Sequence, residues 1–196
     1  MKAILILLLG LANFNANANA NANANANANA NANANAKDNC AAHFDTKMRQ
    51  LHSKASVDLC ELTANKPVLV VNTASFCGYT NQFTGLEELY QQYRDKGLVV
   101  VGFPSDSFSQ EAKDESETAE VCFVNFGVSF PMLATSSVKG GDANQVFKYI
   151  QQQNLIPKWN FNKYLFNSDG ELVERFDSQV APSSSKLKQA IDKVML

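Results

Sequence analysis

The run Val68–Val71 constrains the fold most, because this continuous aliphatic stretch leads directly into a turn of small residues that carries Cys77. Such a run is typical of a strand covered on both faces, as the central strands of parallel sheets are. After the turn, apolar residues at helical spacing extend from Leu86 to Tyr93, and Thr80 is placed to cap that helix. We therefore predict a buried strand that delivers Cys77 to the start of a helix.

The predicted position of Cys77 suggests a reactive thiol. Unpaired backbone N–H groups and the macrodipole at a helix N-terminus favour a thiolate. One helix end supplies only part of the stabilisation that a reactive thiolate needs, so other donors are required. From the residues alone, an inert buried thiol remains an equal alternative.

The rest of the chain predicts an α/β fold. Leu98–Phe103 is a second buried strand, expected to be parallel to the first, and the loop 104–112 follows at its carboxyl end, where ligands bind in open α/β sheets. The further predicted elements are a helix at 115–126 bearing Cys122, an extended stretch from 130, a helix at 143–152, a hairpin of 157–166 and 171–176, and a helix at 183–196. This order predicts a thioredoxin-like fold with a central mixed sheet flanked by helices.

Length and composition exclude several classes of protein. At 196 residues the chain favours one main domain, and its net charge of -2 comes without a basic cluster, so we expect no nucleic-acid partner. His43 and His52 lack the spacing of a zinc or iron site. We expect neither a metal nor a cofactor.

The N-terminus predicts export. Lys2 and the apolar stretch 3–12 resemble a signal peptide, here placed at 1–18 with an uncertain cleavage site, and the stretch is too short to span a bilayer. The Asn-Ala alternation at 15–36 predicts a disordered spacer, although an Asn ladder is conceivable. We expect a folded domain at 37–196 that is periplasmic or extracellular and has no membrane anchor after cleavage.

Cys40 and Cys60 bracket a segment that we expect to form a short strand or hairpin before the core. In an oxidising compartment, a disulfide between them would contribute roughly 3 kcal/mol. We prefer this structural role to a catalytic pair, because neither cysteine has the helix-start context of Cys77.

Several separated motifs resemble the glutathione peroxidase family, and the similarity extends over roughly residues 40–196. They are Val71-Asn-Thr-Ala-Ser-Phe-Cys-Gly-Tyr-Thr80, Gly102-Phe-Pro104, Phe130-Pro131 and Trp159-Asn-Phe-Asn-Lys-Tyr-Leu165. The resemblance implies that Cys77 is the peroxidatic residue, in the cysteine rather than selenocysteine form. It also implies that Trp159 and Asn160 are its polar neighbours, whose N–H groups can donate to a thiolate.

One position departs from the family pattern. Family members commonly carry glutamine in the loop after Phe-Pro, and this chain has Ser107 at the position that we assign to it. A serine hydroxyl is shorter and would reach the sulfur only through water. Gln110 is close in sequence, but we assign it to a different motif position.

The resemblance further implies that Cys122 resolves an oxidised Cys77, with a helix-core cysteine as the alternative. A thioredoxin-like protein or a low-molecular-weight thiol would then be the reductant of a monomeric enzyme. The expected reaction is reduction of hydrogen peroxide and organic hydroperoxides through a Cys77 sulfenic acid. The alternatives are an exported thiol-based peroxide sensor, an adhesive module, and a thioredoxin-like disulfide oxidoreductase, which Thr80 disfavours because no Cys-x-x-Cys pair is present.

Overall fold

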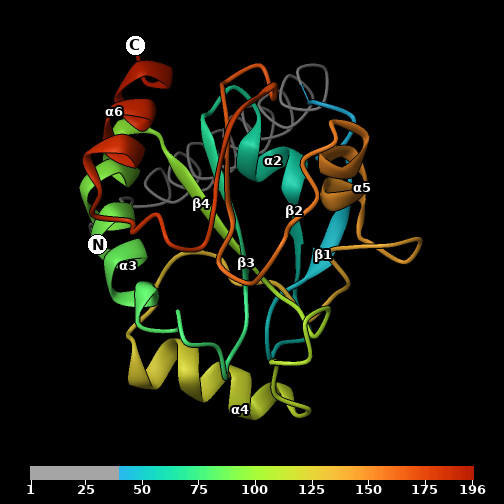
Figure 1. The fold of residues 1–196 in the computed structure, drawn as a ribbon. Coiled ribbons are helices and arrows are strands. Elements are labelled where there is room, and N and C mark those ends of the chain that lie inside the picture. The colour runs from blue at the N-terminus through green and yellow to red at the C-terminus, as the bar shows by residue number, and fades with distance from the viewer. Residues whose placement is uncertain (1–39) are drawn as a thin grey trace, which may run out of the picture.

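The computed structural model describes residues 40–196 (Figure 1). The predicted signal peptide and the predicted Asn-Ala spacer lie outside the described residues. Between residues 40 and 196, no helix is long and apolar enough to cross a membrane.

The core is built on a mixed sheet of β3 (Val68–Thr73), β4 (Val99–Pro104), β5 (Lys163–Phe166) and β6 (Leu172–Phe176) in the order β4-β3-β5-β6. β3 is parallel to β4 and antiparallel to β5, and β5 is antiparallel to β6. Every residue of β3, β4 and β5 is buried, as expected of strands covered on both faces. The predicted mixed sheet is confirmed.

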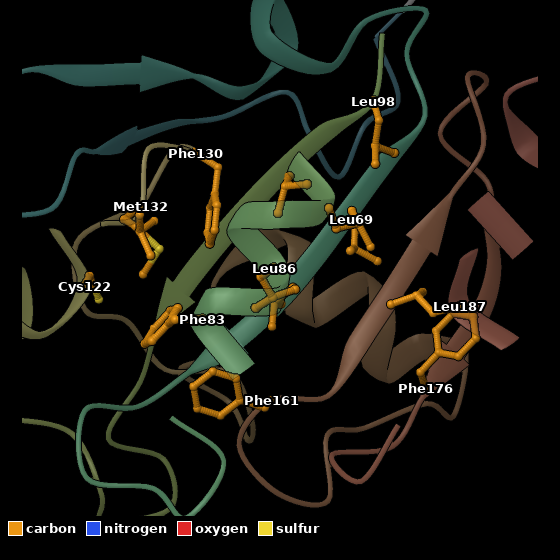
Figure 2. Packing of buried hydrophobic residues seen from close by; sticks show 14 of the residues in the cluster. Leu69, Phe83, Leu86, Leu98, Cys122, Phe130, Met132, Phe161, Phe176 and Leu187 are labelled. Carbon is orange, nitrogen blue, oxygen red and sulfur yellow. The ribbon is translucent and has the colours of Figure 1, made fainter. Parts of the chain in front are cut away.

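The two faces of β3 pack against different helices. Leu69 and Val71 belong to a cluster with α3 (Gln82–Tyr93) and α6 (Ser185–Val194), which Figure 2 shows from close by. Val68 and Val70 pack on the other side with α5 (Gln145–Gln152). The alternation of side chains along a strand therefore places helices on both faces of the sheet.

The segment 131–133 hydrogen bonds along the outer edge of β4. The Gly102 amide donates to the Pro131 carbonyl at 2.9 Å, and the Leu133 amide donates to the Gly102 carbonyl at 3.0 Å. Gly102 is needed at this approach, because a Cβ atom there would lie 2.1 Å from the Met132 sulfur.

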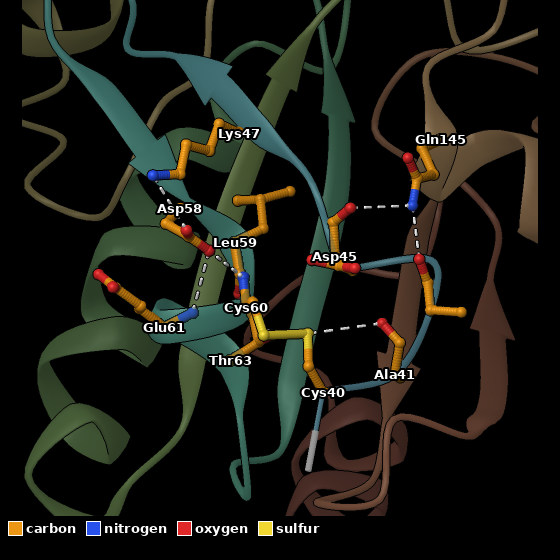
Figure 3. The surroundings of a disulfide bond; sticks show 11 residues. Cys40, Ala41, Asp45, Lys47, Asp58, Leu59, Cys60, Glu61, Thr63 and Gln145 are labelled. Atoms are coloured by element: carbon orange, nitrogen blue, oxygen red, sulfur yellow. Dashed lines mark hydrogen bonds and ion pairs between the residues drawn. A yellow bond between two sulfur atoms is a disulfide. The ribbon is translucent and has the colours of Figure 1, made fainter. Parts of the chain in front are cut away.

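The N-terminal segment forms a hairpin and a short helix. β1 (Lys47–Arg49) pairs antiparallel with β2 (Ser56–Asp58), and α2 (Leu59–Thr63) follows with Asp58 as its N-cap. A disulfide joins Cys40 to Cys60 with their Cα atoms 5.4 Å apart (Figure 3). The predicted hairpin and the predicted pairing of Cys40 with Cys60 are both confirmed, and the structural role of the pair stays a prediction.

Some element boundaries differ from the predictions. The helix at 115–126 is split into α4 (Glu115–Ala119) and a π-helical segment, η2 (Glu120–Asn125), and a 3₁₀ turn, η1 (Arg94–Lys96), follows α3. The first hairpin strand begins at Lys163 rather than Pro157, because Phe161 adopts a left-handed conformation at φ 60° that no regular strand contains.

Candidate active site

Cys77 lies in the turn between β3 and α3, and only 7 % of its surface is exposed. Thr80 does not cap α3 as predicted. Its hydroxyl instead accepts a hydrogen bond from the Cys77 amide at 3.1 Å and donates to the Cys77 carbonyl at 2.6 Å. The helix begins at Gln82, with Asn81 at the N-cap position and no side-chain cap. Thr80 therefore fixes the backbone that presents the thiol.

The sulfur of Cys77 faces a backbone donor. The Tyr79 amide donates to Cys77 Sγ at 3.5 Å. An N–H group aimed at sulfur stabilises a thiolate more than a thiol, because the negative charge strengthens the hydrogen bond. This contact supplies one donor to the sulfur in addition to the start of α3.

Gln110 connects the Cys77 turn to the segment that carries Asn160. Its backbone carbonyl accepts from the Phe76 amide at 2.9 Å, and its side-chain carbonyl accepts from Asn160 Nδ2 at 3.0 Å. Gln110 lies within the predicted ligand loop after β4, but its link to Asn160 was missed. The useful signal was Gln110 itself, the one glutamine of the loop 104–112, three residues after Ser107.

Ser107 is directed elsewhere. Its hydroxyl bonds to Ser105 Oγ at 3.0 Å and accepts from the Val138 amide at 3.1 Å, which fastens the loop to the segment at 137–138. The left-handed conformation of Ser109, at φ 57°, turns the chain between Ser107 and Gln110. Gln110, and not Ser107, is therefore hydrogen bonded to Asn160.

Asn160 and Trp159 lie in a turn before β5 and have different surroundings. Asn160 is fully buried, whereas 41 % of Trp159 is exposed and its indole packs against Phe108 with ring centroids 5.4 Å apart. Among the hydrogen bonds of residues 40–196, none joins either side chain directly to Cys77. Asn160 is linked to the thiol's turn through Gln110.

Asn72 holds this turn from the end of β3. Its side-chain amide donates to the Trp159 carbonyl at 3.0 Å. Its backbone carbonyl accepts from the Phe161 amide at 2.6 Å, and its backbone amide donates to the Asn162 carbonyl at 3.3 Å. These bonds hold Phe161 in its left-handed conformation. Such strain persists only where the surrounding structure fixes it, and it is frequent at functional sites.

A hollow of about 340 Å³ opens beside Tyr79, two residues after Cys77 in the sequence. Its lining residues are Tyr79, Lys158, Trp159, Asn162, Asp177, Ser178 and Gln179. Tyr79, whose amide donates to the sulfur of Cys77, and Trp159 therefore line the same hollow.

Cys122 lies on η2 and is buried in the same hydrophobic cluster as Cys77 (Figure 2). Burial, and then the charge of Glu111, raise the pKa of Cys122 to about 12. In the folded arrangement Cys122 is therefore a protonated thiol. Within residues 40–196, no group of three or more histidine, cysteine or acidic side chains is arranged to hold a metal ion.

Comparison with known proteins identifies the family. Residues 42–151 match the family model described as glutathione peroxidase. The chain belongs to the glutathione peroxidase family. A glutathione peroxidase-like peroxiredoxin, GPX5 of Chlamydomonas reinhardtii, is 50% identical over 136 residues, which cover 66% of this chain and 83% of that relative.

Solved structures agree with this family and with the fold. The crystal structure of Trgpx in apo form has a TM-score of 0.61 and 32% sequence identity, and the match covers 79% of this chain and 95% of that chain. A thioredoxin family protein from Chlorobium tepidum, a thiol:disulfide interchange protein, has a TM-score of 0.60 at 10% identity, covering 77% and 93% of the two chains. This second likeness shows the thioredoxin-like fold alone.

Proposed function

We propose that this member of the glutathione peroxidase family reduces hydrogen peroxide and organic hydroperoxides with Cys77 as the attacking thiol. The observation that carries the proposal is the position of Cys77. Its sulfur accepts a hydrogen bond from the Tyr79 amide, and its turn is linked through Gln110 to the buried Asn160. Membership of the family supports thiol-dependent peroxide reduction.

The Cys77 thiolate attacks the terminal peroxide oxygen. The sulfur–oxygen bond forms as the O–O bond breaks, so sulfur is oxidised to a sulfenic acid and the leaving oxygen takes a proton to become water or an alcohol. We assign the polar hydrogens of the Trp159 indole and the Asn160 side-chain amide to the stabilisation of developing charge. Gln110 orients Asn160 through the side-chain hydrogen bond.

Cys122 then resolves the sulfenic acid. Its thiol attacks the Cys77 sulfur, a disulfide forms and water leaves. Because Cys122 is buried on η2, this step requires η2 to open locally. A thioredoxin-like dithiol, or a low-molecular-weight thiol, then reduces the disulfide, and this choice of reductant follows from the peroxiredoxin names of the relatives.

We further propose that the enzyme acts as an exported monomer in the periplasm or outside the cell. The signal-like sequence at the N-terminus and the Cys40–Cys60 disulfide support export, because disulfides persist in oxidising compartments. Secretion of the full chain and its mass in solution by light scattering test this part of the proposal.

Peroxide consumption by the purified protein tests the reaction itself. The wild type should react with hydrogen peroxide far faster than free cysteine, Cys77→Ser should not react, and Cys122→Ser should stop at the sulfenic acid. Mass spectrometry after one equivalent of peroxide distinguishes the free thiol, the sulfenic acid and the Cys77–Cys122 disulfide. A wild-type Cys77 that reacts no faster than free cysteine contradicts the proposal.

One observation favours a second candidate, a peroxide sensor. Cys122 is protonated and buried, so resolution waits for local opening while the Cys77 sulfenic acid persists. A partner thiol could capture the sulfenic acid during that interval. Trapping of a mixed disulfide with a partner protein in cells that express the wild-type chain, with Cys122 intact, distinguishes the sensor from a dedicated peroxidase.

A further inference from the structure

A buried carboxylate, Glu111, joins the turn of Cys77 to the helix of Cys122. Its Oε1 atom accepts from the hydroxyl of Ser75, from the Ala112 amide at 2.8 Å and from Thr118 Oγ1 at 3.0 Å. Ser75 lies just before Cys77, and Thr118 is in α4, just before η2. The proposed reaction assigns Glu111 no role.

The segment that carries Cys122 has few fully buried side chains, and its partly buried Val121 and Phe126 also pack against the core. Between residues 113 and 127, the only buried residues are Thr118, Ala119 and Cys122. The outer face of η2 exposes Val124 to 75 %, and the π-helical turn departs from regular α-helical bonding. A segment with so little burial opens at low cost unless polar contacts hold it.

We propose that Glu111 is a positioning residue that latches the Cys122 segment closed through Thr118 and thereby limits the rate of Cys77–Cys122 disulfide formation. This inference rests on the proposed function. For Cys122 to reach the sulfenic acid, η2 must leave the core, and the hydrogen bond from Thr118 to Glu111 opposes that movement. The bond is strong because its acceptor is a buried carboxylate.

The charge of Glu111 acts in the same direction as its hydrogen bonds. It disfavours the thiolate of Cys122 for as long as the segment stays packed. Opening separates the thiol from this charge and from the desolvating core, so the nucleophile forms only in the open state. Closure of the segment therefore limits both the access and the ionisation of Cys122, with burial as the larger cause of the raised pKa and the charge of Glu111 as the smaller.

The test compares variants of Thr118 in the full-length reduced protein. Thr118→Ala removes the hydroxyl, and Thr118→Ser is the matched control that keeps it. After one equivalent of hydrogen peroxide, rapid quenching with an alkylating reagent and mass spectrometry follow the disulfide. Thr118→Ala should form it about tenfold faster than the wild type, as expected for the loss of one hydrogen bond to a charged group, and Thr118→Ser should match the wild type.

Glu111→Gln provides a second variant that keeps the Oε1 acceptor but removes the charge, and it should also accelerate disulfide formation. Glu115 lies on the same helix as Thr118 and forms an exposed ion pair with Arg49 of β1. Glu115→Gln breaks this ion pair and should change the rate of disulfide formation by less than about twofold. Equal rates in Thr118→Ala and Thr118→Ser, or an unchanged rate in Glu111→Gln, would overturn the latch.

Hydrogen exchange separates the latch from the proposed resolving role. The amides of 120–125 should exchange about tenfold faster in reduced Thr118→Ala than in Thr118→Ser, independently of any peroxide chemistry. If the wild type forms no Cys77–Cys122 disulfide, the resolving role fails while the exchange still reports on the latch. If the disulfide forms but exchange and rate are the same in both variants, the latch fails and the peroxidase proposal stands.

Discussion

At the scale of single residues, the side-chain amide of Gln110 connects the parts of the site. It joins Asn160, from the turn before β5, to a loop whose backbone also holds Phe76 beside the reactive thiol. Among residues 40–196, the Asn160 side chain has no other hydrogen-bond partner, and its buried Oδ1 is unpaired. The orientation of the Asn160 amide therefore depends on Gln110.

Gln110→Ala should slow the reaction of Cys77 with hydrogen peroxide by about 10- to 100-fold, because loss of the acceptor frees the Asn160 amide to rotate away from developing charge. Ser107→Ala is the matched control from the same loop and should keep the rate within about twofold. Stopped-flow fluorescence of Trp159, the single tryptophan, measures both variants. A normal rate in Gln110→Ala together with a slow Ser107→Ala would restore the assignment to Ser107.

His43 gives a prediction for acid stability. Its ring stacks on Tyr149 with centroids 3.9 Å apart, and burial lowers the pKa of His43 to about 4 from 6.5. Between these values the unfolded chain binds a proton that the folded chain does not. The contribution of neutral His43 is therefore complete above pH 6.5 and is lost as the pH falls toward 4.

Urea unfolding from pH 7 to pH 4 measures this contribution. The wild type should lose roughly 1–3 kcal/mol relative to His43→Phe across that window, because phenylalanine keeps the stacking surface and has no proton to bind. Comparing the two proteins cancels the titration of their shared carboxylates. Parallel stability curves for the two proteins would show that His43 does not titrate in this way.

At the scale of elements, the turn before β5 depends on the last residues of β3. Asn72 contacts Trp159, Phe161 and Asn162 by separate hydrogen bonds, so one strand end both delivers Cys77 and holds the tryptophan turn. The turn that carries Cys77 and the turn that carries Trp159 are thus both held by the end of β3.

Asn72→Ala should lower the free energy of unfolding by about 1–2 kcal/mol, because the Trp159 carbonyl loses its donor. It should also slow peroxide reduction and shift the emission of Trp159. Thr73→Val is the control on the same strand, since the buried hydroxyl of Thr73 has no partner in the described part of the chain and its removal should cost nothing. Urea unfolding and stopped-flow kinetics of the two variants measure the stability and the rate of peroxide reduction. Equal values in Asn72→Ala and Thr73→Val would contradict the role of Asn72.

The elements themselves were largely predictable, and their junctions were not. The aliphatic runs that became β3 and β4 and the spacing that became α3 follow from local periodicity. The contact of Gln110 with Asn160 joins residues 50 positions apart and depends on the left-handed turn at Ser109, neither of which local periodicity specifies. The π-helical form of η2 was unpredictable for the same reason.

At the scale of the whole molecule, the Cys40–Cys60 disulfide closes a loop with a sequence separation of 20. It ties the start of the described chain to α2, where the Asp58 carboxylate accepts from the amides of Cys60 and Glu61 (Figure 3). Cys40 packs with the cluster on the α5 face of the sheet, opposite the cluster that contains Cys77.

The free energy of unfolding of the double variant Cys40→Ser/Cys60→Ser should be about 3 kcal/mol lower than that of the oxidised wild type, because the unfolded chain of the variant is less constrained. The reaction rate of Cys77 should stay within about twofold, since the bridge lies on the other side of the sheet. Urea unfolding under non-reducing conditions and peroxide stopped-flow measure the two effects. A large loss of rate in a folded variant would point to a redox role for this pair.

The hydrogen bonds between 131–133 and β4 also affect how crowded copies of the domain behave. They fill part of one edge of the sheet, while the other edge strand, β6, carries Glu174, paired with Lys186 at 3.1 Å, and Arg175, paired with Asp177. Because one edge is partly occupied and the other carries charged side chains, few unpaired backbone groups are available for a strand of another chain to pair with. The fold itself thus opposes growth of the sheet into aggregates.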